Sequence, residues 1–175
     1  MQATGNQPPI NIKNKDKWIN AERLRWSKSL NIPIGTKMPS PFPQSTVQTQ
    51  RALCYISQKH PQHLTAALDA LYHAFWVETK TIGKPEVIAE TLGKALGKEV
   101  TEDVMKGLGS DAAKQALKDN SDQAFKDGAF GLPWFVATNE KGETEGFWGV
   151  DHIGQVLEHL GVDVPRHKSG YKAML

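Results

Sequence analysis

The segment GAFGLPWFVAT, at positions 128–138, is the first candidate for a binding site, because its backbone could form hydrogen bonds with a ligand. Two glycines and an aromatic residue precede Pro133, and a short apolar run follows it. A peptide bond before proline adopts the cis form far more readily than other peptide bonds. A cis bond between Leu132 and Pro133 would turn the N–H and C=O of Leu132 toward a cleft instead of into a sheet. The segment therefore predicts a loop that offers backbone hydrogen bonds to a ligand.

Histidines raise the question of a metal site. His60 and His63 form an HxxH pair, and His152 and His159 lie seven positions apart in one expected helix. Either pair could supply two ligands, but no cysteine or carboxylate cluster completes a set of four. Solvated or capping histidines are therefore favoured, and no metal site is predicted. Cys54, the single cysteine, lies on an apolar stretch and is expected to be an inert buried thiol.

The elements that must position the loop begin with a short helix over 18–31. An extended connector, 32–45, should follow, because its four prolines disfavour helix. From 46 to 127 apolar residues recur at three-and-four spacing, which is typical of helices that bury one face. Ala67 and Leu71 lie on one such stripe, and Ile88 and Leu92 on another; Thr101 and Ser110 are expected to cap the two helices that follow.

The last part of the chain favours strand, strand, helix. Residues 134–138 form a continuous apolar run, 139–142 carry a turn signal, and 144–148 can return as a second strand. The run does not alternate, so we expect its strand to be covered on both faces. Asp151 should cap a helix that ends at Gly161.

Composition excludes several classes of protein. The chain has 175 residues, a net charge of +2 and one cysteine. The length suits one domain, and the nearly balanced charge predicts neither a nucleic acid nor a membrane as partner. One cysteine excludes an internal disulfide framework and a CxxC redox pair. The N-terminus resembles no secretion signal. We expect a cytoplasmic protein, with mitochondria and peroxisomes kept as alternatives.

Three strings resemble a known family. GNQPP at 5–9, GAFGLP at 128–133 and FWGVDHIGQVLEHLG at 147–161 are similar to motifs of the kappa class of glutathione S-transferases and of the related 2-hydroxychromene-2-carboxylate isomerases. The resemblance implies a helix-rich α/β fold: an incomplete DsbA-like thioredoxin fold with a large helical insertion and a C-terminal ββα unit. As a single domain over 1–175, it would comprise an arm and loop (1–45), the insertion (46–127) and the thioredoxin-like half (128–175).

The resemblance also implies roles for individual residues. Leu132, beside Pro133, would offer its backbone to the cysteinyl part of glutathione, and Asp151 would bind the γ-glutamyl ammonium. Asn6 and Lys15 lie where the family places polar groups near the thiol and the substrate. His152, next to Asp151, is a candidate for binding or acid–base chemistry, although a helix-surface role is favoured. Two strand residues, Trp134 and Trp148, would wall a pocket for a flat apolar molecule as readily as they would form core.

The departures from the family are also informative. The chain starts just before GNQPP, so we expect it to lack the family's first strand, helix and second strand, with the serine that stabilises the thiolate. Gln7, Val150 and His152 replace a lysine, a serine and an arginine of the family's motifs. Thiol activation by this chain alone is therefore not expected. Whether Met1 is the natural start stays open.

Two functions remain after this comparison. One is a shortened transferase-like or isomerase-like enzyme, with or without glutathione, in which Asp151, His152 or Lys15 acts on a small aromatic or polyketide-like molecule. The other is a non-catalytic module that binds a small molecule or a protein. An open edge on the first strand would have to be covered by a second copy of the chain, by a rearranged N-terminal arm with Ile10 and Ile12, or by a partner that supplies the missing half. The resemblance implies the first, because kappa-class proteins are dimers, so we expect a homodimer in which strands or arms can be swapped.

Overall fold

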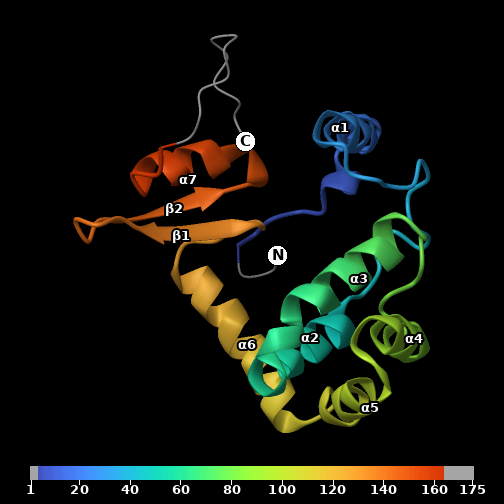
Figure 1. Ribbon diagram of the computed structural model, residues 1–175. Helices are drawn as coiled ribbons and strands as arrows, with labels where there is room; N and C mark the ends of the chain where they lie inside the picture. Colours follow the sequence, from blue (N-terminus) through green and yellow to red (C-terminus); the bar gives the residue numbers. More distant parts are fainter. Residues whose placement is uncertain (1–3, 164–175) are drawn as a thin grey trace. The chain divides into compact units, whose positions relative to one another are not determined.

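The computed structural model describes residues 4–163 of the chain. In these residues most helices precede one β-hairpin, and a further helix follows it (Figure 1). The chain divides into two compact units, residues 8–119 and residues 1–7 with 120–175. The fold is the expected helix-rich α/β arrangement. In chain order the elements are a 3₁₀ turn at Pro9–Asn11, α1 (Lys15–Leu30), α2 (Val47–Lys59), a 3₁₀ turn at Pro61–His63, α3 (Leu64–Trp76), α4 (Pro85–Leu96), α5 (Lys98–Gly107), α6 (Asp111–Lys126), β1 (Trp134–Thr138), β2 (Thr144–Trp148), a 3₁₀ turn at Val150–His152 and α7 (Ile153–His159).

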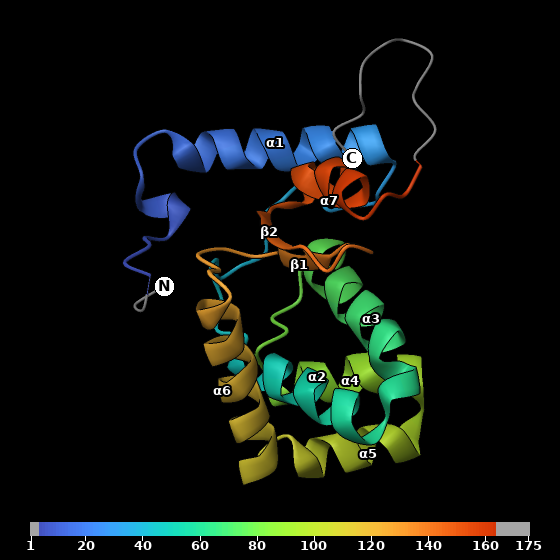
Figure 2. The same ribbon diagram turned by 90° about the vertical axis from the view of Figure 1, so that its left-hand side faces the viewer.

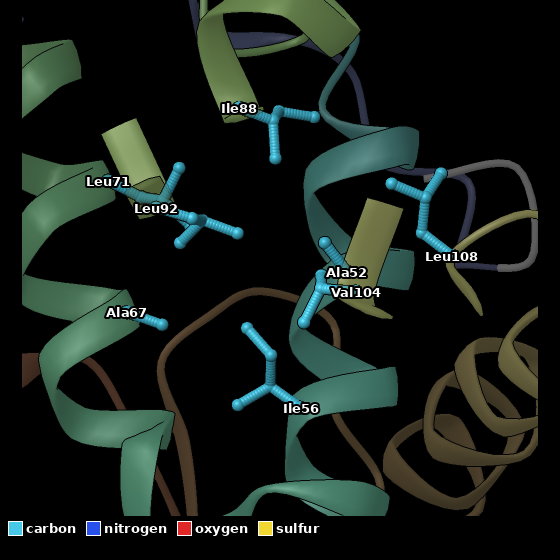
Figure 3. Close-up of a cluster of buried hydrophobic side chains, with 8 residues drawn as sticks. All are labelled: Ala52, Ile56, Ala67, Leu71, Ile88, Leu92, Val104 and Leu108. Carbon is cyan, nitrogen blue, oxygen red and sulfur yellow. The ribbon is translucent and has the colours of Figure 1, made fainter. Parts of the chain in front are cut away.

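The larger unit is built on α2–α5, which pack side by side (Figure 2). Their buried side chains meet in one hydrophobic cluster, drawn in Figure 3: Ala52, Ile56, Ala67, Leu71, Ile88, Leu92, Val104 and Leu108. Burial of each large aliphatic side chain contributes roughly 1.5–3 kcal/mol to stability. The stripes predicted from the sequence thus form the core of this unit.

A close approach between two helices depends on a glycine. A Cβ at Gly107, the last residue of α5, would lie 2.0 Å from Cε2 of Tyr55 on α2. Only glycine therefore lets the Tyr55 ring lie against the backbone of α5. The Tyr55 hydroxyl then donates a hydrogen bond of 3.1 Å to Oδ2 of Asp103, also on α5.

Helix α1 is attached to the same unit through Arg23. Its guanidinium donates hydrogen bonds to the carbonyl oxygens of Gly35 (2.6 Å) and Thr36 (3.1 Å) and lies 5.8 Å from the ring centroid of Trp76. No residue of α1 is buried. Residues 32–46 between α1 and α2 contain no helix or strand, as their prolines predict.

The smaller unit contains the hairpin, with α7 against it (Figure 1). β1 and β2 are antiparallel, and their register places Trp134 opposite Trp148 and Phe135 opposite Phe147. Residues alternate between the faces of a strand. Phe135 and Ala137 therefore share one face with Phe147, whose ring centroid is 5.8 Å from that of His159 on α7.

Three local expectations were wrong. Thr101 lies inside α5 instead of capping it, and its hydroxyl donates to the carbonyl of Gly97 (2.8 Å), where the helix begins. Asp151 does not cap α7, because a 3₁₀ turn separates the two and makes His152 the N-cap residue. β1 is not covered on both faces, since Val136, on the face opposite α7, is 51% exposed. Ser110, in contrast, accepts the expected capping bond from the N–H of Ala113 (3.2 Å).

Candidate functional site

The loop before β1 is held by an aromatic cluster. The Phe130 ring contacts both strand tryptophans, at centroid distances of 5.7 Å to Trp134 and 5.0 Å to Trp148. A Cβ at Gly131 would lie 2.5 Å from Nε1 of Trp148, so the indole rests directly on that residue's backbone. Glycine at 131 and aromatic residues at 130 and 148 therefore form one packed unit.

The N-terminal arm fastens the same loop from another side. The Asn6 amide donates a hydrogen bond of 2.9 Å to the carbonyl oxygen of Phe130, and its own oxygen accepts one of 3.0 Å from the N–H of Gln7. On the hairpin side, the carbonyl of Pro133 accepts a hydrogen bond of 3.0 Å from the N–H of Gly149. The loop is thus fixed at residues 130 and 133.

Leu132 lies between these two anchors and is the most accessible apolar residue of the loop, with 79% of its surface exposed. The peptide bond between Leu132 and Pro133 is cis. Within residues 4–163, no hydrogen bond uses the N–H or C=O of Leu132. Backbone N–H and C=O groups are strong hydrogen-bonding groups that need a partner. The two groups of Leu132 are exposed in an anchored loop, so a ligand can supply that partner.

The outer edge of β1 continues this accessible backbone. The bonds from Gly149 N–H to Pro133 and from Asn139 N–H to Glu143 (3.0 Å) show which residues of β1 face β2. In an antiparallel pair this orientation alternates along the strand. The backbone groups of Trp134, Val136 and Thr138 therefore point to the outer edge, where no strand in the described part of the chain pairs with them.

Asp151 and His152 lie just beyond β2, next to one of the loop's anchors. Oδ1 of Asp151 is 3.5 Å from Nδ1 of His152, a distance that allows an ion pair when the imidazole is protonated. A Cβ at Gly149, whose φ is 94°, would come within 2.4 Å of the same carboxylate oxygen. Glycine therefore makes room for Asp151 to fold back over the turn whose N–H holds Pro133.

The structure brings together most, though not all, of the predicted site residues. Asn6, Leu132, Pro133 and Asp151 belong to the smaller unit, as do His152, Trp134 and Trp148. Lys15 is the first residue of α1, exposed, in the larger unit. The two tryptophans pack on Phe130, whose part in the loop gave no signal in the sequence beyond its place between two glycines.

A second polar cluster lies in the larger unit. Nε2 of His60 is 2.8 Å from Oδ2 of Asp103, the oxygen to which Tyr55 also donates. The hydrogen bond with His60 holds the pKa of Asp103 below its usual range, and burial together with the bond to Asp103 raises the pKa of Tyr55. An open pocket of about 520 Å³ borders this cluster.

Neither this cluster nor another one in residues 4–163 gathers three or more histidine, cysteine, aspartate or glutamate side chains in a way that could hold a metal ion. The HxxH histidines do lie close, with ring centroids 6.4 Å apart, but His60 is turned to Asp103.

Fold and site now define the class of protein. The chain belongs to the DsbA-like thioredoxin domain family, whose model matches residues 1–161. Among individual proteins it is similar to human glutathione S-transferase kappa 1, with 27% identity over 91% of this chain and 72% of that protein. It is also similar to glutathione S-transferase kappa 2 of Caenorhabditis elegans, with 28% identity over 87% of this chain and 69% of the nematode protein. Glutathione S-transferase kappa 1 of Rattus norvegicus is 26% identical over 92% of this chain and 73% of the rat protein.

These comparisons confirm the resemblance to the kappa class that the three sequence motifs indicate. In the described residues no helix has the length and apolar character needed to cross a membrane.

Proposed function

We propose that this chain binds glutathione along the loop at Leu132 and acts as a transferase-like or isomerase-like enzyme on a small aromatic or polyketide-like molecule. The observation that carries the proposal is Leu132 itself: an exposed residue with both backbone groups available, in a loop anchored on two sides. A tripeptide can pair with such a residue through main-chain hydrogen bonds, as an added strand does at a sheet edge.

Asp151 would supply the charged contact. Its carboxylate is exposed and is held over Gly149, whose N–H bonds to Pro133, the residue after Leu132. A glutathione that pairs with Leu132 could therefore place its ammonium group against Asp151. Hydrogen bonds between charged groups contribute about 1.5–3 kcal/mol, which is more than a neutral backbone bond supplies.

For the chemical step, Asp151 and His152 are the proposed acid–base groups, and Lys15, which lies in the larger unit, is the proposed alternative. The carboxylate and imidazole are close enough to share a substrate proton, and histidine exchanges protons near neutral pH. Trp148 and Phe130 present the aromatic surface beside Leu132, each 48% exposed, on which a flat substrate would lie. If the reaction only moves a proton that the substrate itself carries, the activity would not require glutathione.

A titration with glutathione, followed by tryptophan fluorescence, tests the proposal. We expect saturable quenching, because Trp148 lies against Gly131 beside the binding residue. Asp151→Asn should raise the dissociation constant at least tenfold, since about 1.4 kcal/mol corresponds to a factor of ten. Glu158→Gln, an exposed acidic residue of α7, is the matched control. No saturation with the wild-type chain up to millimolar glutathione would remove the glutathione role.

The alternative is a binding module without catalysis. The backbone site alone supports it, because binding needs Leu132 and not the acid–base pair. The module is favoured if glutathione or an aromatic ligand binds but is not converted by the wild-type chain, by Asp151→Asn or by His152→Gln.

We further propose the cytoplasm as the compartment, and a homodimer as the assembled form.

A further inference from the structure

The cavity beside His60 lies in the larger unit and has no part in the site at Leu132. Its volume is about 520 Å³, which falls within the range of about 300–1,000 Å³ that is typical of sites for small molecules. At 100° per residue, the charged α5 residues at its wall fall within about 100° of one another around the helix axis. The wall is formed by His60, Glu99, Val100, Glu102, Asp103 and Lys106.

Two donors fix the side chain of Asp103 in this wall. Nε2 of His60 is 2.8 Å from Oδ2 of Asp103, and the Tyr55 hydroxyl donates to the same oxygen over 3.1 Å. The bond with His60 keeps the pKa of Asp103 below its usual range, so the group is a carboxylate at neutral pH and its oxygens only accept hydrogen bonds. The proton of a neutral His60 therefore lies on Nε2, and Nδ1 keeps its lone pair.

Nδ1 of His60 is thereby left as a hydrogen-bond acceptor. No bond within residues 4–163 uses this nitrogen, and it is not among the buried polar atoms that lack a partner. Only 22% of the His60 side chain is exposed, so the ring is held in place while Nδ1 can still be reached. A histidine that donates from one nitrogen to a carboxylate is oriented to accept a bond, or bind a ligand, with the other.

The rest of the wall consists mainly of acceptors as well. Glu99 and Glu102 are exposed carboxylates. Glu102 has a contact of 3.8 Å with Lys98, in which both side chains are more than half exposed, and such surface pairs are weak. Of the six wall residues three are carboxylates and one, Lys106, is a cation, so the wall has a net charge of −2 when His60 is neutral. A ligand that fits must be positively charged and must carry several N–H donors.

From this arrangement we propose that the cavity binds a small aliphatic amine with two ammonium groups. One ammonium donates to Nδ1 of His60, the other donates to Glu99 and Glu102, and the methylene chain between them contacts Val100. A bare metal ion does not suit the cavity, because no three histidine, cysteine, aspartate or glutamate side chains in residues 4–163 come together closely enough to hold one. The site is independent of glutathione binding and of catalysis at Leu132.

Calorimetric titration of the full chain with hexamethylenediamine, at low ionic strength and without glutathione, tests the proposal. We expect saturable binding, with changes in the amide NMR spectrum concentrated in α5. Hexamethonium has the same two charges and the same methylene chain but no N–H, so its dissociation constant should be roughly tenfold higher or more. Equal binding of the two compounds would show attraction by charge alone and would overturn the proposal. Absence of saturation by the diamine up to millimolar concentration would overturn it too.

His60→Phe removes the acceptor and keeps an aromatic ring of similar shape. It should weaken binding of the diamine roughly tenfold or more. His63→Phe, which changes the other histidine of the HxxH pair, is the matched control and should bind as the wild type does, because His63 is not part of the cavity wall. Nitrogen-15 NMR of the wild type at mildly alkaline pH, where histidine is neutral, should show the His60 proton on Nε2. A proton on Nδ1 would contradict the proposed contact.

A second pair of variants applies if His60→Phe disturbs the fold by circular dichroism. Glu99→Gln removes one exposed acceptor of the wall and should raise the dissociation constant of the diamine roughly threefold or more. Glu86→Gln, at an exposed position in the first turn of α4, removes the same charge outside the cavity and is its control. Equal affinity of these two variants for the diamine would reject the cavity as its binding site.

Discussion

The side-chain amide of Asn6 donates a 2.9 Å hydrogen bond to the carbonyl oxygen of Phe130, a residue 124 positions later in the chain. The contact joins the N-terminal arm to the loop that presents Leu132. A ligand that pairs with Leu132 needs the loop in one conformation, and each bond that fixes the loop lowers the entropy lost on binding. Asn6 is thus placed to act on the ligand through Phe130.

Asn6→Asp should weaken both the fold and glutathione binding. An ionised aspartate has no N–H to donate and would face a carbonyl oxygen, so we expect a loss of about 1 kcal/mol in unfolding free energy, the usual net value of one hydrogen bond. Urea denaturation measures the loss. The exposed neighbour Gln7, changed to Glu, adds the same charge without touching Phe130 and serves as control. Equal stability of the two variants would show that the Asn6 contact contributes nothing.

Gly131→Ala should displace Trp148. The new Cβ would lie 2.5 Å from the indole Nε1, so the ring must swing away and lose its contact with Phe130. We expect a red-shifted tryptophan emission and a cost of about 0.5–1.5 kcal/mol, the value of one aromatic pair. Gly109→Ala is the matched control, because no atom lies within 4 Å of its added Cβ. An unchanged emission spectrum would contradict the close contact.

Gly107→Ala tests the other close approach. Its Cβ would lie 2.0 Å from Cε2 of Tyr55, and moving the ring also breaks the bond from Tyr55 to Asp103. Overpacking of this kind costs roughly 1–3 kcal/mol. Gly93→Ala, in α4, meets no atom within 4 Å and should instead stabilise by about 0.5–1 kcal/mol. Denaturant midpoints of the two variants should therefore move in opposite directions; a shift in the same direction rejects the steric argument.

The hairpin was predictable from sequence, and its surroundings were not. The bounds of β1 and β2 agree with the expected 134–138 and 144–148, because the apolar run, the turn at Asn139–Gly142 and the return strand are all local signals. The exposure of Val136 does not follow from the sequence, since a continuous apolar run does not tell which face of the strand will be covered. Asp151 is not the cap that the sequence predicts, because local sequence does not distinguish a 3₁₀ turn from the first turn of an α-helix.

The site was predictable only in part for a similar reason. Leu132, Pro133 and Asp151 are in recognisable motifs, so their positions could be named in advance. The bond from Asn6 to Phe130 and the one from His60 to Asp103 join residues 124 and 43 positions apart, and no local pattern encodes such contacts. The sequence does not predict which glycines are needed for packing. The roles of Gly131 and Gly107 follow only from the structure, in which an aromatic ring lies against each.

Glu90 should make stability depend on pH in the acid range. Lys94 and Lys80 bond to its carboxylate at 2.6 Å and 3.0 Å, and they lower its pKa from 4.5 to about 2. A carboxyl with a lowered pKa in the folded state stabilises the fold at pH values above 4.5, and this contribution is lost as the pH falls toward 2. Glu90→Gln should accordingly lower Tm at pH 7, and the difference from wild type should vanish near pH 2.

Added salt should shrink the Glu90 effect, since the side chain is about half exposed and its ion pairs are screened. Thermal unfolding of both proteins by circular dichroism between pH 2 and pH 7 is the measurement. Glu140→Gln, at the exposed hairpin turn, is the control and should show no such pH dependence. A Tm difference that stays constant over this range would exclude the lysine contacts as its cause.

His159 links α7 to β1 and to the hairpin turn, and its loss should destabilise the smaller unit. Its Nε2–H is the donor near two carbonyl oxygens, those of Ala137 and Glu143, and only 10% of the side chain is exposed. His159→Leu keeps much of the packing on Phe147 but removes this donor. Because the carbonyl of Glu143 still accepts from the N–H of Asn139, we expect a loss of about 0.5–1.5 kcal/mol, the net value of one hydrogen bond. Urea denaturation gives the value, and His73→Leu, at an exposed position of α3, is the control.

Hydrogen exchange in His159→Leu should also be accelerated more in β1 and β2 than in α2–α5, because the lost contact lies in the smaller unit. Equal acceleration in both units would mean that they unfold together and that His159 stabilises the whole chain.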